Sequence, residues 1–293
     1  MPHAVIAAHP THWRVMGRGA RPALMLHCSL AHSGAWTGLS ALLEDALTMT
    51  APDLPGHGRS ADWNGTPPLH GLATDIAAEL AASLAHGAPV DVIGHSFGGT
   101  IALRLALERP DLVKSLTLIE PVFFAAARIA NTPEYAETAK AQPEFDIAMA
   151  EGRHLDAARW FHSRWGMGTA LDDMPEVQRN YMVDRISLIP AVNDVLLDDS
   201  AGLLVPGRLE SLQVPVLLIE GGQSPVIIDA VNRTLASRIP GTQRLLVPGA
   251  GHMVPITHPT RIAGPILAHL GLGPDGGPAP VSDVSRTVRT PLA

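Results

Sequence analysis

The chain has 293 residues, of which 46% are hydrophobic and 17% are charged, and its formal net charge is −7. This length fits one large domain or a domain with an insertion, and the composition excludes a disordered or fibrous chain. Acidic residues outnumber basic ones, 28 to 21, so nucleic acid is not an expected partner. The single cysteine, Cys28, excludes an intrachain disulfide and a zinc site built from cysteines.

The N-terminal stretch has no basic region followed by a long apolar run, so we expect no signal peptide. A membrane-spanning helix needs a run of about 18 apolar residues, and we find none. We therefore expect a cytoplasmic protein with no membrane partner.

Short apolar runs alternate with helical stretches along the chain. The stretch 3–16 fits an antiparallel edge hairpin. Buried strands are expected at 23–27, 89–94, 113–119, 214–220 and 243–247. Helices are expected near 36–44, 71–86, 97–108, 226–239 and 258–270. This alternation predicts the α/β class, with a mostly parallel sheet that has helices on both faces.

Residues 122–202 break the alternation, because they contain no good strand and are punctuated by prolines. The segment holds 13 acidic and 7 basic residues and eight of the 12 aromatic residues. We expect an inserted helical cap at 122–202 on a core made of 1–121 and 203–272. The alternative is that these helices are peripheral parts of the main domain. The stretch 273–293 is rich in Pro, Gly, Ser and Thr and is expected to be disordered.

A nucleophile candidate lies between the strand expected at 89–94 and the helix expected at 97–108. The residues there are Gly94-His95-Ser96-Phe97-Gly98. A sharp strand-to-helix turn would expose the serine oxygen, and the N–H groups at the start of the helix could stabilise an oxyanion. The alternative is a glycine-rich turn with an idle serine.

A serine nucleophile needs an adjacent base, and the best candidate is His252. It lies in Pro248-Gly249-Ala250-Gly251-His252, after the last expected strand, where a loop could reach Ser96. Most of the other histidines near strand ends are expected to be structural; these are His27, His32, His57 and His95. No H-E-x-x-H pattern occurs, so a histidine metal site is not expected.

Four motifs in order resemble those of the α/β-hydrolase superfamily. Leu26-His27-Cys28-Ser29, with Trp36 downstream, resembles the loop after the third strand of that family. Asp53-Leu54-Pro55-Gly56-His57-Gly58-Arg59-Ser60 resembles its D-x-x-G-x-G-x-S loop. The serine motif and the G-x-G-H at His252 follow. The resemblance covers roughly residues 3–271 and implies an eight-stranded sheet with an inserted helical cap.

The resemblance also implies an oxyanion hole made by the backbone N–H groups of Ser29 and Phe97. The family usually has glycine where this chain has Cys28, which narrows the loop. A lone buried cysteine is usually inert, so we expect no nucleophilic role for it. The residues expected to line the substrate pocket are His27, Cys28, Leu30, Phe123 and Trp160.

The acid of the triad departs from the family pattern. Ser224 stands where the family usually has Asp, and it cannot carry a negative charge. Glu120 ends the strand expected at 113–119, and pairing with His252 would explain a carboxylate beside so apolar a strand. The alternatives are a Glu120 bonded to loop backbone or facing solvent, and Asp229 as the acid.

These residues favour a serine hydrolase that cleaves a carboxylic ester or a related acyl compound without a cofactor or metal. Hydrolysis of a C–C bond, lactone or amide stays open, and a cofactor-free oxygenase is a remote option. A non-catalytic ligand-binding sensor on the same scaffold is the alternative from another class. The aromatic residues of 122–202 favour a small apolar substrate, and its acidic excess disfavours polyanions. The family resemblance leaves a homodimer open.

Overall fold

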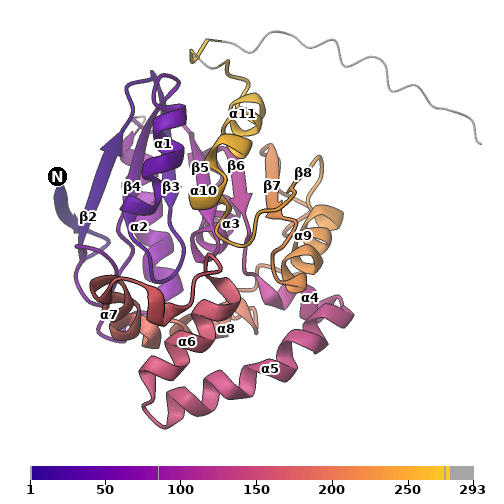
Figure 1. Ribbon diagram of the computed structural model, residues 1–293. Helices are drawn as coiled ribbons and strands as arrows, with labels where there is room; N and C mark the ends of the chain where they lie inside the picture. Colours follow the sequence, from indigo (N-terminus) through magenta and orange to yellow (C-terminus); the bar gives the residue numbers. More distant parts are fainter. Residues whose placement is uncertain (1, 85, 274, 278–293) are drawn as a thin grey trace, which may run out of the picture.

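The computed structural model describes residues 2–84, 86–273 and 275–277. Eight strands form one sheet in the order β1-β2-β4-β3-β5-β6-β7-β8 (Figure 1). The strands are β1 (His3–Ile6), β2 (His9–Met16), β3 (Arg21–Leu26), β4 (Leu47–Pro52), β5 (Val90–His95), β6 (Val113–Ile119), β7 (Val216–Gly221) and β8 (Gln243–Val247). The eight strands and the α/β class match the sequence prediction.

The sheet is mostly parallel, as predicted. Strands β3 to β8 all run in one direction, whereas β2 is antiparallel to both β1 and β4. The N-terminal hairpin is therefore present. The strand expectations omitted β4, Leu-Thr-Met-Thr-Ala-Pro, because its two threonines interrupt the apolar run. The sheet accommodates both threonines. Thr50 is buried, and Thr48 Oγ1 donates a hydrogen bond to the Gly19 carbonyl at 2.6 Å.

Helices cover both faces of the sheet, because neighbouring side chains of a buried strand point to opposite faces. Leu24 and Leu26 of β3 pack with the helices of one face, and Ala23 and Met25 pack with those of the other. The first face carries α2 (Leu69–Leu84), α3 (Phe97–Glu108) and α9 (Val226–Arg238). The second carries α1 (Thr37–Leu43), α10 (Val254–Thr257) and α11 (Pro259–His269).

The chain leaves the sheet after β6, forms a run of helices and returns at β7. These helices are α4 (Phe124–Ile129), α5 (Pro133–Ala150), α6 (His154–Trp165), α7 (Glu176–Arg185) and α8 (Asn193–Leu196). They lie together below the sheet in Figure 1, and none of residues 122–202 is in a strand. Leu30, from the loop after β3, joins a small apolar cluster with Phe145 and Ile186 of this segment. The segment thus packs against loops at the carboxyl ends of the strands.

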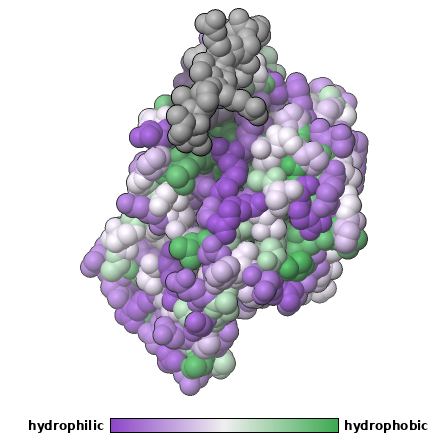
Figure 2. Space-filling view, turned by 90° about the vertical axis from the view of Figure 1, so that its right-hand side faces the viewer, coloured by the Kyte–Doolittle hydropathy of each residue, from purple (hydrophilic) through white to green (hydrophobic). Residues whose placement is uncertain are grey.

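The surface over α9 and β8 is mostly hydrophilic. Figure 2 shows this side with hydrophobic residues scattered among hydrophilic ones. Within the described ranges, no helix is long and apolar enough to cross a membrane. The tail expected to be disordered, 273–293, lies largely outside the described residues.

A buried ion pair ties together the strands that carry the loops of the site. Arg21 of β3 donates to both carboxylate oxygens of Asp91 on β5, and one of these contacts is 2.8 Å long. Ser115 of β6 also donates to Asp91, at 2.6 Å. The Asp91 side chain is fully buried, whereas Arg21 keeps 20% of its side chain exposed.

We expect Asp91→Ala to lower the free energy of unfolding by about 3 kcal/mol, because it leaves the Arg21 guanidinium without its buried partner. Urea denaturation measures the change. Asp111→Ala is the matched control, since it breaks the exposed pair between Arg109 and Asp111. An Asp91→Ala variant as stable as this control would contradict a stabilising role for the buried pair.

Candidate active site

Ser96 occupies the sharp turn between β5 and α3. Its backbone has φ 54° and ψ −116°, outside the regions that side chains ordinarily adopt. The neighbouring glycines make this turn possible. A Cβ added at Gly98 would lie 2.1 Å from the Leu26 carbonyl oxygen, and one at Gly94 would lie 2.3 Å from the Gly98 oxygen. The motif is therefore required by close backbone packing as well as by the turn.

Ser96, His252 and Glu120 form a continuous chain of hydrogen bonds. His252 Nε2 lies 2.9 Å from Ser96 Oγ, and His252 Nδ1 lies 2.9 Å from Glu120 Oε2. All three side chains are buried. With the serine hydroxyl donating to Nε2, the Nδ1–H donates to the carboxylate. The three residues follow β5, β6 and β8, whose carboxyl ends lie at the same edge of the parallel sheet.

Glu120 lies at the end of β6 with φ 53°, and its carboxylate is fully enclosed. Its Oε1 accepts hydrogen bonds from the Gly221 N–H and from Ser224 Oγ, the latter at 2.8 Å. Burial raises the pKa of Glu120, and these two hydrogen bonds oppose that rise. Ser224 thus carries no charge, as the sequence indicates, but its hydroxyl donates to Glu120 and favours the ionised form of that side chain. Sequence reasoning missed this role, although the position of Ser224 in the motif was a signal.

His252 is set up as a neutral base. Burial lowers its pKa to about 3, so the imidazole holds no extra proton near neutral pH. Its ring contacts the rings of His95 and Trp165, with ring centroids 5.3 and 4.8 Å away. His95 Nε2 donates to the His252 carbonyl at 2.9 Å. His95 therefore has the structural role that the sequence suggested, and it links the serine turn to the histidine loop.

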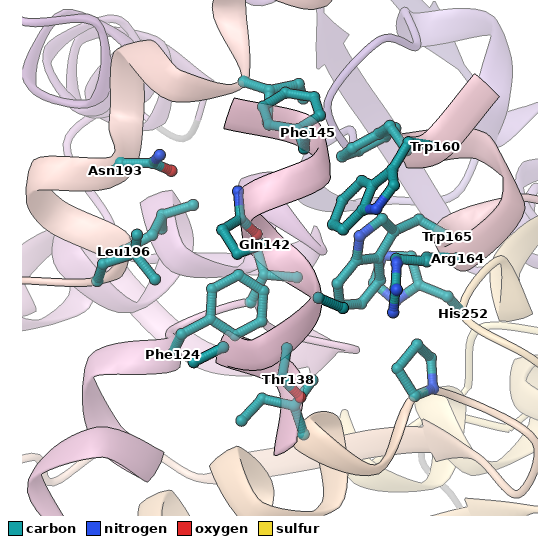
Figure 3. Close-up of a pocket in the computed structure, with 18 of the residues that line it drawn as sticks. Phe124, Thr138, Gln142, Phe145, Trp160, Arg164, Trp165, Asn193, Leu196 and His252 are labelled. Atoms are coloured by element: carbon teal, nitrogen blue, oxygen red, sulfur yellow. The ribbon is translucent and has the colours of Figure 1, made fainter. Parts of the chain in front are cut away.

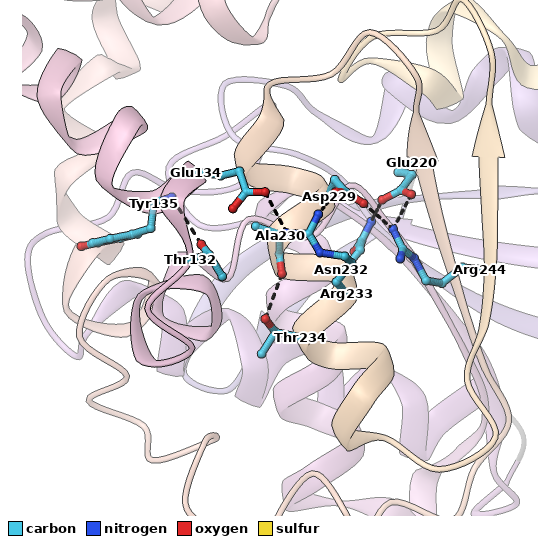
Figure 4. Close-up of polar contacts among 10 residues, drawn as sticks. All are labelled: Thr132, Glu134, Tyr135, Glu220, Asp229, Ala230, Asn232, Arg233, Thr234 and Arg244. Atoms are coloured by element: carbon cyan, nitrogen blue, oxygen red, sulfur yellow. Dashed lines mark hydrogen bonds and ion pairs between the residues drawn. The ribbon is translucent and has the colours of Figure 1, made fainter.

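Asp229, the alternative acid, is paired elsewhere. It lies half-exposed on α9 and binds Arg233 and Arg244, with Arg244 Nη2 2.7 Å away. Arg244 also binds Glu220 at the end of β7, so these side chains form one surface network (Figure 4). Arg233 extends the network to Glu134 at the start of α5. Glu120, and not Asp229, contacts His252, because Asp229 points to the outer face of α9.

The loop after β3 lies beside Ser96. Leu30 has φ 57°, and its N–H donates to His57 Nε2 at 3.1 Å, which fixes the loop. Phe97 is the first residue of α3, where N–H groups have no partner within the helix. Burial raises the pKa of the Cys28 thiol to about 12, so this cysteine is not a thiolate near neutral pH.

Two cavities meet at Ser96. The larger has a volume of about 840 Å³ and is lined by aromatic residues, including Phe124, Phe145 and Trp160 (Figure 3). The smaller has a volume of about 410 Å³ and extends along the loop after β3 towards α7. Five residues line both cavities: Ser29, Ser96, Phe161, Trp165 and His252.

The residues expected to line a pocket divide into two groups. Cys28 and Leu30 line the smaller cavity, and Trp160 lines the larger one. His27 and Phe123 line neither, contrary to expectation, because both are fully buried. His27 instead braces two loops, since its Nε2 accepts from the Leu54 N–H at 2.9 Å and its Nδ1 donates to the Cys28 carbonyl. In the part of the chain that the structure describes, no three His, Cys, Asp or Glu side chains are placed to hold a metal ion.

Comparison with known proteins gives consistent matches. The sequence model described as the alpha/beta hydrolase family matches residues 23–264. Lipase LipV of Mycobacterium tuberculosis is 30% identical over 271 residues, which cover 86% of this chain and 94% of the lipase. An esterase of the same organism is 30% identical over 259 residues, covering 83% of this chain and 80% of the esterase. The crystal structure of an alpha/beta hydrolase from Sphaerobacter thermophilus has the same fold, with a TM-score of 0.69, 22% identity and coverage of 92% and 100%.

We expect Glu120→Gln to slow covalent labelling of Ser96 by a fluorophosphonate at least about 100-fold, because an amide cannot stabilise the imidazolium that forms on His252. Intact mass spectrometry over time measures the labelling rate. Asp229→Asn is the matched control and should label at the wild-type rate. Equal labelling rates of the two variants would show that Glu120 does not stabilise the protonated form of His252.

Proposed function

Because the chain belongs to the alpha/beta hydrolase family, we propose that it is a serine hydrolase that cleaves carboxylic esters through an acyl-enzyme. The observation that carries this proposal is the hydrogen-bonded chain from Ser96 through His252 to Glu120 where the two cavities meet. The similarity of the chain to a lipase and to an esterase supports an ester bond as the bond that is cleaved.

In the acylation step, Ser96 Oγ attacks the ester carbonyl while His252 Nε2 takes the hydroxyl proton. Glu120 stabilises the resulting imidazolium through Nδ1–H. The N–H groups of Phe97 and Ser29 are proposed to stabilise the oxyanion. His252 then gives its proton to the departing alcohol, which leaves an ester between Ser96 and the acyl group.

Deacylation repeats these steps with water as the nucleophile. His252 takes a proton from water, the hydroxide attacks the acyl carbonyl, and the proton returns to Ser96 Oγ as the acid departs. A lactone, an amide or a C–C bond next to a carbonyl would use the same residues. A sensor that only binds its ligand would not need a serine, a neutral imidazole and a buried carboxylate joined in this way.

We expect wild-type protein to gain the mass of one phosphonyl group when exposed to a fluorophosphonate, and Ser96→Ala to gain none, because only an activated serine reacts readily. Hydrolysis of p-nitrophenyl esters, measured by release of p-nitrophenol, should be lost in the same variant. Folded wild-type protein that neither reacts with the probe nor cleaves any ester would refute the proposed function.

We expect Ser224→Ala to move the acidic limb of the pH profile of kcat/KM to higher pH by about one unit. Loss of the hydroxyl donor destabilises the Glu120 carboxylate and raises its pKa, and a hydrogen bond to a charged group is worth about 1.5–3 kcal/mol. Since activity needs the ionised carboxylate, ester hydrolysis should fall first at low pH. Ser224→Thr keeps the hydroxyl and should keep the wild-type profile. A Ser224→Ala profile identical to that of the wild type would show that this bond does not tune the acid.

A further inference from the structure

The two cavities that meet at Ser96 differ in their chemistry. Ser96 lines both, so each cavity begins at the reacting serine and extends in a different direction. An ester has two arms, one on each side of its carbonyl carbon. A carbonyl held at Ser96 would therefore place one arm in each cavity.

The smaller cavity is lined without any Asp, Glu, Lys or Arg among the described residues. Four of the nine methionines of the chain line it: Met167, Met174, Met182 and Met253. Methionine is unbranched and flexible, so it adapts its shape to a flexible apolar ligand. The rim is apolar too, since Met167, Val177 and Ile256 are exposed there by 49%, 83% and 36%.

Most polar side chains of the smaller cavity already have partners within the protein, whereas those of Ser29 and Gln178 make no hydrogen bond within the described chain. Tyr181 donates its hydroxyl to the Ala31 carbonyl at 2.8 Å and accepts from the Gly58 N–H at 2.7 Å. His162 Nε2 donates to the Thr169 carbonyl at 2.8 Å, and His32 Nδ1 accepts from the Gly34 N–H at 3.0 Å. Burial keeps the Cys28 thiol protonated. Among its described lining residues, this cavity therefore offers no Lys or Arg side chain and few unpaired donors to a charged ligand.

The larger cavity has the opposite character. Its aromatic lining suits a ring, and Arg164 lies over the Trp160 ring with its guanidinium carbon 4.4 Å from the ring centroid. Within the described chain, no carboxylate pairs with Arg164, and the side chains of Asn193 and Gln223 make no hydrogen bond. Figure 3 shows Arg164 on the His252 side of this cavity and Asn193 on the opposite side. This cavity can therefore take a bulky arm that carries polar groups.

We infer that the substrate is an ester with two unlike arms, an uncharged linear apolar chain in the methionine-lined cavity and a bulkier ring-bearing or polar arm in the larger cavity. The inference rests on the proposed function and specifies the class of ester that the proposed hydrolase cleaves. In a p-nitrophenyl ester the ring takes the aromatic-lined cavity, so the acyl chain takes the methionine-lined one. The smaller cavity then sets the preference for acyl chain length.

Filling the smaller cavity tests this assignment. Wild-type protein should cleave p-nitrophenyl octanoate with a kcat/KM at least about tenfold above that for p-nitrophenyl acetate, since each buried methylene contributes about 0.8 kcal/mol. Met174→Trp and, independently, Met182→Trp should each reduce this octanoate-to-acetate ratio at least about tenfold. Two indole substitutions serve as controls and should keep the ratio: Leu197→Trp in the larger cavity and Ile147→Trp on the exposed face of α5, outside both cavities.

Wild-type protein alone gives a second test that does not depend on the folding of a variant. The p-nitrophenyl half-ester of suberic acid has the same chain length as the octanoate but ends in a carboxylate. A cavity without Lys or Arg should reject it, because burying an unpaired charge is costly. We expect its kcat/KM to be at least about tenfold below that of the octanoate.

The outcomes separate this inference from the proposed function. Absence of ester cleavage together with absence of fluorophosphonate labelling would refute both. Ester cleavage with a labelled Ser96 would keep the function, but the inference is wrong if folded Met174→Trp and Met182→Trp keep the wild-type ratio. It is also wrong if wild-type protein cleaves the suberate half-ester as well as the octanoate.

Discussion

A carboxylate removed from water is stable only where donors surround it, and Glu120 has three. The Gly221 N–H, the Ser224 hydroxyl and His252 Nδ1 all point at its two oxygens. Gly221 and Ser224 lie at the end of β7 and in the loop that follows it, and His252 lies in the loop after β8, so the carboxylate joins these two loops to the end of β6. The position of His252, and through it the orientation of Ser96, depends on this one buried group.

The sheet places the site, and buried contacts within the sheet maintain it. The Arg21–Asp91 pair and Ser115 connect β3, β5 and β6, whose following loops carry Ser29, Ser96 and Glu120. His95 adds a second link, because it bonds the backbone of His252 from the turn that holds the serine. These contacts hold the His252 imidazole in a fixed position. A catalytic base needs such a fixed position to take a proton from the serine efficiently.

Much of this could be predicted from the sequence, for identifiable reasons. The turn at Ser96 was predictable because the close approach of Gly98 to Leu26 requires glycine there. Glu120 was predictable because a carboxylate after an apolar strand needs a partner. The strand β4 was missed because its two threonines interrupt the apolar run, and only the folded chain buries Thr50 and pairs Thr48 with Gly19. For the same reason His27 and Phe123 could not be assigned, since only the packing decides whether a residue near the site faces a cavity or the core.

The position of the acid has a consequence for how this scaffold can change. Because Glu120 at the end of β6 supplies the carboxylate, the loop after β7 does not need to supply one. Gln223, Pro225 and Val226 of that loop line the larger cavity instead. Only Ser224 still serves the acid, through its hydroxyl. Insertions and substitutions in this loop could therefore reshape the bulky-arm site while the proton-transfer machinery stays intact. The protein thus has a region open to variation in the loop where the resemblance to the family would have placed the acid.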